Sequence, residues 1–178
     1  MEEKKLLEAT LGFLVRDGRV WLAIKTRNIG KDRWNGYGGG VELEDKSVMD
    51  CLKREILKEC EVEIQEKSTE EVAIIDFHNT KSDGEIFVCK VHVFFIKEWT
   101  GTPRESEEMA SPTEFDFDKL PFDKMMLADK EWLPIVLAGE KLIGEYHYGP
   151  FQKELIKEGK IQIVKELPRE NFRGFKIH

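Results

Sequence analysis

The chain has 178 residues, of which 28 are Lys or Arg and 35 are Asp or Glu, giving a formal net charge of −7. A composition that is 40% hydrophobic excludes a wholly disordered chain, and the acidic balance argues against a non-specific nucleic-acid binder, which would be basic. No apolar run reaches the ~18 residues of a membrane span, and the 3 cysteines form no CxxC pair, so we expect one cytoplasmic domain with reduced thiols.

The first elements along the chain are predicted to be a β-hairpin and a loop. Asp17-Gly18 separates two apolar runs, at 11–15 and 20–24, and this arrangement is typical of a tight hairpin. Residues 29–40 are rich in glycine and therefore predict a loop.

A helix is predicted over 47–60, where Ser47 and Asp50 resemble a capping box. The apolar residues of this segment form one stripe, with Glu55 at its edge and Glu59 inside it. A carboxylate in an apolar face is costly unless it is paired or holds a cation, and two carboxylates four residues apart repel each other. A bound divalent metal ion would resolve both problems. The alternative is a solvated helix in which Glu59 pairs with an Arg or Lys.

The rest of the chain predicts further strands and one more helix. Residues 100–123 combine Gly, Pro and acidic residues, so they suggest irregular structure. A second helix is predicted over 132–144, with Asp129 as a candidate cap. The remaining predicted strands are 72–77, 86–99 and 160–164. This order predicts an α/β fold, a mixed β-sheet sandwiched between helices, in a single domain spanning 1–178.

The loop at 34–40 has the sequence WNGYGGG, in which glycines allow the backbone to approach a ligand or an ion closely. It lacks the Gly-Lys-Ser/Thr ending of a P-loop, which disfavours a Walker-type ATPase. His78 and His92 lie in or beside predicted strands and are interpreted as structural residues rather than ligands.

This loop and the following helix resemble the Nudix box, G-x5-E-x7-R-E-U-x-E-E-x-G-U, whose second half is matched by REILKECEV at 54–62. Further segments resemble the MutT-homologue oxidised-purine nucleoside triphosphatases of that family. The resemblance runs from Thr10 to Tyr148 and leaves 149–178 as a C-terminal extension. The segments are 34–39, 91–94, 101–103, 105–109, 121–122 and 129–134.

The box departs from the family pattern at three positions. Lys58 stands where the family has the first Glu of a pair, and Glu61 replaces a glycine. The early acidic position falls on Lys46, but a one-residue insertion in the glycine loop would bring Asp45 there instead. In the family this acid supports the box arginine, which is Arg54 in this sequence.

The resemblance implies a Nudix fold and an enzyme that cleaves a purine nucleoside triphosphate, oxidised or unmodified, to monophosphate and pyrophosphate. It implies Mg²⁺ as the cofactor, with Mn²⁺ as an alternative. By resemblance, the metal-binding positions are Gly39, Glu55, Glu59 and Glu108. The three glutamates are also the catalytic candidates, and the sequence does not separate metal ligand from general base.

The same resemblance implies a set of substrate-binding residues. For two of them, Lys25 and Arg33, a solvated surface charge is the alternative, and Asp129 is alternatively only a helix cap. Ala128 stands where the family has a second Asp, so the substrate range is expected to differ. The implied residues are Thr10, Lys25, Arg33, Asn35, Met109, Met126 and Asp129.

Two alternative functions remain open at this point. Lys58 is compatible with a catalytically weak nucleotide-binding module, because an ammonium group there can take the place of a metal charge. A Nudix pyrophosphatase for another nucleoside diphosphate derivative is the second alternative. The expected partner is a nucleoside triphosphate, with no nucleic-acid polymer and no membrane, and a monomer is favoured.

Overall fold

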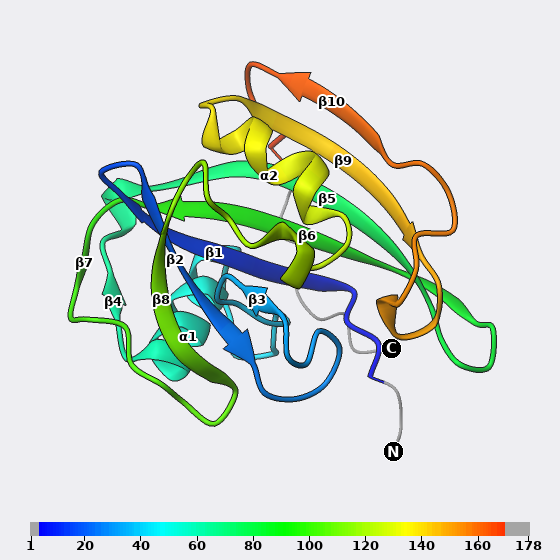
Figure 1. Ribbon diagram of the computed structural model, residues 1–178, viewed down its shortest axis with the longest axis horizontal. Helices are drawn as coiled ribbons and strands as arrows, with labels where there is room; N and C mark the ends of the chain where they lie inside the picture. Colours follow the sequence, from blue (N-terminus) through cyan, green and yellow to red (C-terminus); the bar gives the residue numbers. More distant parts are fainter. Residues whose placement is uncertain (1–3, 170–178) are drawn as a thin grey trace.

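The structure is a computed structural model that describes residues 4–169 (Figure 1). Its helices are α1 (Val48–Cys60) and α2 (Asp129–Leu137). Its strands are β1 (Glu8–Arg16), β2 (Arg19–Lys25), β3 (Trp34–Asn35), β4 (Glu63–Ile64), β5 (Thr69–Thr80), β6 (Ile86–Ile96), β7 (Trp99–Thr100), β8 (Met109–Asp116), β9 (Lys141–Tyr148) and β10 (Lys160–Val164). Three short 3₁₀ turns are η1 (Glu66–Ser68), η2 (Phe122–Lys124) and η3 (Pro150–Gln152).

The described strands form a mixed sheet in the order β10-β9-β5-β6-β1-β2-β3, with β8 paired to β2, while β4 and β7 form a separate small sheet. The pairs β1–β6 and β5–β9 are parallel and the other pairs are antiparallel. The predicted hairpin is confirmed: Asp17 and Gly18 both have positive φ, at 53° and 73°, as a two-residue turn between right-twisted strands requires.

Consecutive residues of β1 point to opposite faces of the sheet. One face packs against α2 and the other against α1. Phe13 faces α2 and lies edge-on to Trp132, with 6.2 Å between ring centroids. Leu14 belongs to a second core cluster with Leu52 and Ile56 of α1. The predicted sandwich of helices around a mixed sheet is therefore confirmed.

The predicted first helix is confirmed, and its two ends explain its length. Ser47 Oγ accepts a hydrogen bond from Asp50 N at 3.0 Å, which caps the first turn. At the other end Glu61 is left-handed, with φ of 57°, and its N–H donates to Leu57 O at 3.0 Å. The family's glycine at this position suits that conformation better, so Glu61 is a tolerated, mildly strained replacement.

The prediction of a helix over 132–144 is wrong in its second half. The helix α2 ends at Leu137, Gly139 follows with φ of 99°, and residues from Lys141 onward form β9, parallel to β5. Asp129 is also not the cap, because it is the first helical residue and Ala128 occupies the N-cap position.

The prediction of irregular structure over 100–123 is also wrong in part, because this range contains β8 and the start of η2. The predicted strand 72–77 extends to 69–80, and the predicted strand 86–99 is divided into β6 and β7. The predicted strand over 160–164 is confirmed as β10, which pairs with β9 at the end of the sheet order.

A buried ion-pair cluster joins three strands on the α1 face of the sheet. His92 Nδ1 lies 2.9 Å from Glu71 Oε1, and His92 Nε2 lies 3.3 Å from Glu8 Oε2. Burial lowers the pKa of His92, but its bonds to the two glutamates outweigh that effect and raise the pKa to about 9. These contacts support the structural interpretation of His92.

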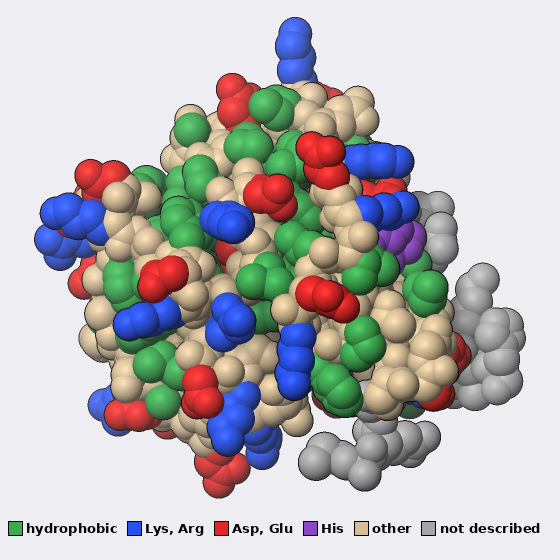
Figure 2. All heavy atoms as spheres, turned by 45° about the vertical axis from the view of Figure 1, so that its right-hand side comes forward, with side chains coloured by type: hydrophobic (Ala, Val, Ile, Leu, Met, Phe, Trp, Pro, Cys, Tyr) green, Lys and Arg blue, Asp and Glu red, His purple; other side chains and the backbone are tan. Residues whose placement is uncertain are grey.

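On the face shown in Figure 2, Lys and Arg side chains are interspersed with Asp and Glu. Within residues 4–169, neither α1 nor α2 combines the length and apolar character that crossing a membrane requires.

Candidate active site

Two carboxylates of α1 are buried against the glycine-rich loop. Glu55 is 4% exposed and Glu59 is 5% exposed. Glu59 Oε2 accepts a hydrogen bond from Gly38 N at 3.0 Å, while Glu55 accepts one from Arg54 Nη1. The alternative of a solvated helix is therefore wrong: both side chains face the loop that precedes the helix.

The loop can approach these carboxylates closely because the residues that face them, Gly38 and Gly39, have no side chain. A Cβ on Gly39 would lie 2.7 Å from the carboxyl carbon of Glu55, closer than packed atoms allow. The Gly39 carbonyl accepts a hydrogen bond from Thr10 N at 2.9 Å, which holds the loop against β1, and a weaker one from Cys51 Sγ at 3.6 Å.

The box arginine is held by the acid that a one-residue insertion predicts. Arg54 Nη2 lies 2.7 Å from Asp45 Oδ2 and Arg54 Nε lies 2.9 Å from Asp45 Oδ1, a bidentate pair. Arg54 Nη2 also donates to Gly40 O at 3.1 Å. Asp45, rather than Lys46, therefore takes the early acidic position, and the departure from the box pattern is a shift of register.

The third predicted carboxylate, Glu108, comes from the segment just before β8. Its Oε1 lies 2.5 Å from Arg27 Nη2 and 3.2 Å from Lys58 Nζ. Burial raises the pKa of Glu108, but the bonds to these two cations outweigh burial and lower it. The side chain of Lys58 thus reaches from α1 across the site to Glu108.

The three carboxylates share one electrostatic environment. Burial, together with the charges of Glu55 and Glu108, raises the pKa of Glu59 to about 8, against the opposing effects of Gly38 N–H and Lys25. Burial also lowers the pKa of Lys25, against the pull of Glu59 and Glu108. Their oxygens do not all come within 4.8 Å of one another, since Glu108 is held by its two cations. An oxygen-rich cluster of this kind fits a hard divalent cation.

These groups lie along an open groove of about 2100 Å³. Lys25 and Arg33 contribute to its wall, and Arg33 also donates to Met125 O, so neither is simply a solvated surface charge. The predicted site residues that line the groove are Lys25, Arg33, Gly39, Glu55, Glu59, Glu108 and Met126.

Four predicted substrate-binding residues do not line the groove. The Thr10 hydroxyl is buried 3.5 Å from Cys51 Sγ, and Met109 is part of the core around α1. Asn35 Oδ1 accepts a hydrogen bond from Gly36 N at 2.9 Å. Asp129 is buried, with 4% of its surface exposed.

Asp129 has an incomplete hydrogen-bond shell. Trp132 Nε1 donates to its Oδ1 at 3.2 Å, but its Oδ2 is buried with no hydrogen-bond partner among the described residues. Burial raises the pKa of Asp129 to about 7, despite the nearby charge of Arg33. A carboxyl group in this state is able to donate or to accept a hydrogen bond near neutral pH.

Sequence reasoning did not anticipate two residues of this region. Arg27, two residues after Lys25, neutralises Glu108, and nothing in its surroundings in the sequence distinguishes it from a surface arginine. Tyr37 is wholly buried, with its hydroxyl lacking a hydrogen-bond partner among the described residues, and burial raises its pKa. An aromatic residue among four glycines, at 36 and 38–40, is a sequence signal from which the burial of Tyr37 could have been predicted.

Comparisons with known proteins all indicate one family. Residues 6–135 match the family described as the NUDIX domain. The chain is 34% identical over 168 residues to an oxidized purine nucleoside triphosphate hydrolase of Danio rerio, covering 94% of this chain and 100% of that protein. It is 34% identical over 139 residues to the protein of the same name from Mus musculus, covering 78% and 85%. A crystal structure of a MutT protein from Bacillus halodurans superposes with a TM-score of 0.71 at 22% identity, covering 91% of this chain and 100% of that one.

Proposed function

The chain belongs to the Nudix family of hydrolases, and we propose that its substrate is a purine nucleoside triphosphate, oxidised or unmodified, cleaved to monophosphate and pyrophosphate. The observation that carries this proposal is the convergence of Glu55, Glu59 and Glu108 on a groove whose wall also presents Lys25 and Arg33. The names of the two curated relatives support the choice of an oxidised purine substrate, and they do not favour a binding module without activity.

Nudix hydrolases use divalent metal ions, and we propose Mg²⁺ here, with Mn²⁺ as a substitute. Buried Glu55 and Glu59 would hold it, because Arg54 pairs with Glu55 while Glu59 has no ion pair with an Arg or Lys among the described residues, and oxygen donors suit these ions. The Gly39 carbonyl and Glu108 are further donors. When bound, such an ion neutralises phosphate charge and lowers the pKa of a bound water.

The residues of the chain contribute positioning, charge and a proton acceptor. Lys25 and Arg33 lie on the groove wall, where their charges favour phosphate oxygens. A carboxylate of the three-glutamate cluster takes the proton from the attacking water. For Glu108 to act as a ligand or base, its ion pairs with Arg27 and Lys58 must open. We propose that the substrate's phosphates draw these two cations away.

We propose that Asp129 reads the edge of the purine base, with Asn35, Thr10 and Met109 around it. None of the four lines the groove in this structure, so this role requires the groove wall to open when the base binds. The unpartnered Oδ2 of Asp129 supports this role, because a ligand that supplies a hydrogen bond there removes the cost of a buried unsatisfied oxygen. Met126, which lines the groove one turn before Asp129, would cover the face of the base.

We further propose that the chain is a cytoplasmic monomer that binds no nucleic-acid polymer, consistent with its net charge of −7. Residues 1–178 would form one Nudix domain in which 149–178 are a C-terminal extension. The strand β10, which prolongs the sheet beside β9, supports the view that this extension belongs to the domain.

The test is pyrophosphate release from a panel of adenine and guanine nucleoside triphosphates and their oxidised forms, with Mg²⁺ or Mn²⁺. We expect turnover of at least one member, and a loss of at least ~100-fold in kcat for Glu59→Gln. The exposed Glu63→Gln is the matched control and should retain activity. Folded wild-type protein that turns over no member of the panel would refute the proposal.

A further inference from the structure

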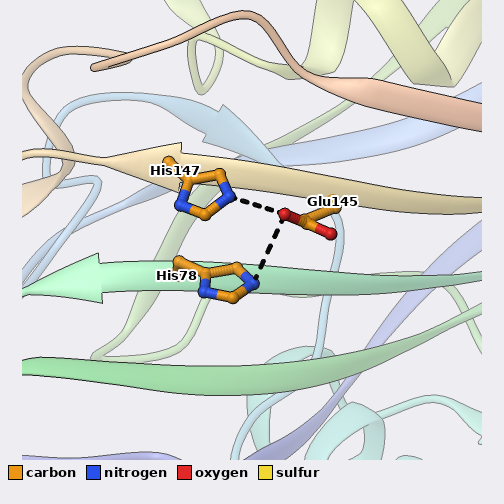
Figure 3. Close-up of side chains that lie close together, drawn as sticks. All are labelled: His78, Glu145 and His147. Carbon is orange, nitrogen blue, oxygen red and sulfur yellow. Dashed lines mark hydrogen bonds and ion pairs between the residues drawn. The ribbon is translucent and has the colours of Figure 1, made fainter.

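A second group of ligand-type side chains lies away from the groove, on the pair of strands β5 and β9. His78 and His147 are direct neighbours in the parallel register of these strands, and Glu145 precedes His147 by two residues on the same strand. Residues two apart on a strand share a face. The three side chains accordingly gather on one side of the sheet (Figure 3).

The geometry of this group is close to that of a metal centre. His147 Nε2 lies 2.7 Å from Glu145 Oε1, and His78 Nε2 lies 3.8 Å from the same oxygen (Figure 3). The two imidazole rings are stacked, with centroids 4.0 Å apart and planes inclined by 20°. Among residues 4–169, these side chains offer one ligand atom each within 4.8 Å of one another.

The distances require only small adjustments to bind an ion. With Zn–N and Zn–O bonds of about 2.1 Å in tetrahedral geometry, ligand atoms sit roughly 3.4 Å apart. The observed separations of 2.7 Å and 3.8 Å lie on either side of that value. The side chains are partly exposed, at 28% for His78, 38% for Glu145 and 16% for His147. Small side-chain rotations can therefore move the ligand atoms by the few tenths of an ångström that are needed.

The charge state of the group also suits a cation. Burial, together with the charge of His147, lowers the pKa of His78. A neutral imidazole keeps the lone pair that a metal needs. Two positive charges lie near the group and disfavour a bound cation: Lys157 beside His78 and Lys160 beside Glu145. The negative charge of Asp76, also beside His78, favours one.

We propose that His78, Glu145 and His147 form a binding site for a Zn²⁺-class transition-metal ion, separate from the Mg²⁺ site of the groove, with water completing the coordination. Two imidazoles and one carboxylate are a donor set for Zn²⁺ or its first-row neighbours rather than for Mg²⁺, which prefers oxygen. From the sequence, His78 is interpreted as structural because it lies beside a predicted strand; the strand register that makes His147 its neighbour is seen only in the structure. The role is independent of the proposed hydrolase activity.

An ion at this position would act on the C-terminal part of the sheet. It would link β9 to β5 just before Tyr148, which is followed by η3. Gln152 of η3 donates to Asn79 Oδ1 at 2.7 Å, so the linked strands also carry part of the groove wall. Binding to the folded state alone raises stability in proportion to the logarithm of the ion concentration.

The test is calorimetric titration of the full chain with Zn²⁺ in the presence of excess Mg²⁺, which occupies the carboxylate site. We expect one Zn²⁺ per chain, a rise in melting temperature with Zn²⁺, and visible absorption of a tetrahedral type when Co²⁺ replaces it. His78→Gln and His147→Gln should each lower Zn²⁺ affinity at least ~100-fold, since even the partners of metal ligands are worth ~10–100-fold.

Glu140→Gln, a nearby exposed carboxylate in the turn before β9, is the matched control for Glu145→Gln and should bind Zn²⁺ as the wild type does. His178→Gln controls for histidine content. The proposal is overturned if wild-type protein binds no Zn²⁺ under these conditions. It is equally overturned if folded His78→Gln/His147→Gln protein binds Zn²⁺ with unchanged affinity.

Discussion

Replacing Glu59 by Gln should stabilise the metal-free protein while it removes activity. The carboxylate of Glu59 is 5% exposed and lies in the field of Glu55 and Glu108. Its pKa is raised from 4.5 to about 8, chiefly by burial. Gln has nearly the same shape, carries no charge, and its amide oxygen can still accept the hydrogen bond from Gly38 N.

The size of the effect follows from the shift in pKa. A group whose folded-state pKa is raised favours folding below its unfolded pKa, and this advantage is lost as pH rises through the folded value. At about 1.4 kcal/mol per pH unit, the full cost of ionising Glu59 in the fold approaches ~5 kcal/mol, and relaxation with water entry reduces it. We therefore expect Glu59→Gln to be more stable than wild type by roughly 2–4 kcal/mol at pH 8.5 and by about 1 kcal/mol or less at pH 5.5.

The assay is urea unfolding of both proteins with a chelator present, between pH 5.5 and 8.5. The exposed Glu63→Gln is the control, and its stability should follow that of wild type across the range. Added Mg²⁺ should stabilise wild type more than Glu59→Gln. The reasoning is refuted if Glu59→Gln is less stable than wild type at pH 8.5, or if the difference does not grow with pH.

Three further predictions concern neighbouring features. Gly39→Ala should weaken Mg²⁺ activation at least ~10-fold, measured by activity against Mg²⁺ concentration, because the new methyl group would meet Glu55 at 2.7 Å; an unchanged curve would show that the loop simply moves aside. Asp45→Asn should lose about 1–3 kcal/mol of unfolding free energy, because it leaves Arg54 without its bidentate partner, and equal urea midpoints would contradict this. The pKa of His92 is raised to about 9, so its contribution should be complete below pH 6.5 and disappear as pH rises through about 9; His92→Gln should flatten the alkaline part of the stability profile, and parallel profiles would argue against the ion-pair cluster.

Local chemistry in the sequence was sufficient to predict the first hairpin and the first helix, but not the short strands β3, which lies inside the predicted loop over 29–40, and β4. The Asp17-Gly18 turn and the Ser47 cap each specify their element through contacts within a few residues, and both are present. Helix periodicity places Glu55 at the edge of the apolar stripe and Glu59 inside it, but it leaves a solvated helix open, and only the structure shows that both side chains are buried. Glu108 is different, because only the family resemblance, and not its spacing, connects it to the helix.

The second half of the fold required contacts that are distant in the sequence. The segment from Lys141 forms a strand because it pairs in parallel with β5, some 70 residues earlier, and this pairing overrides local helical preference. In the structure, alternate residues of β9 are buried, and Gly139 has a positive φ that ends the helix before it. The helix prediction gives no weight to the glycine at that position. Among the strands of residues 4–169, β8 pairs only with β2, so its outer edge tolerates Pro112 and polar residues and shows no apolar alternation.

The same limit applies to the proposed Zn²⁺ site. His78 and His147 are 69 positions apart, and only the register of β5 and β9 makes them neighbours. Sequence spacing alone finds metal sites whose ligands lie on one helix or one loop, and it cannot find one whose ligands are joined by strand pairing.

The most direct test of the central claim is to identify the products formed from a purine nucleoside triphosphate with Mg²⁺. We predict nucleoside monophosphate and pyrophosphate in equal amounts, formed at least ~100-fold more slowly by Glu59→Gln under the same conditions. Release of orthophosphate with nucleoside diphosphate, or full activity in Glu59→Gln, would contradict the account.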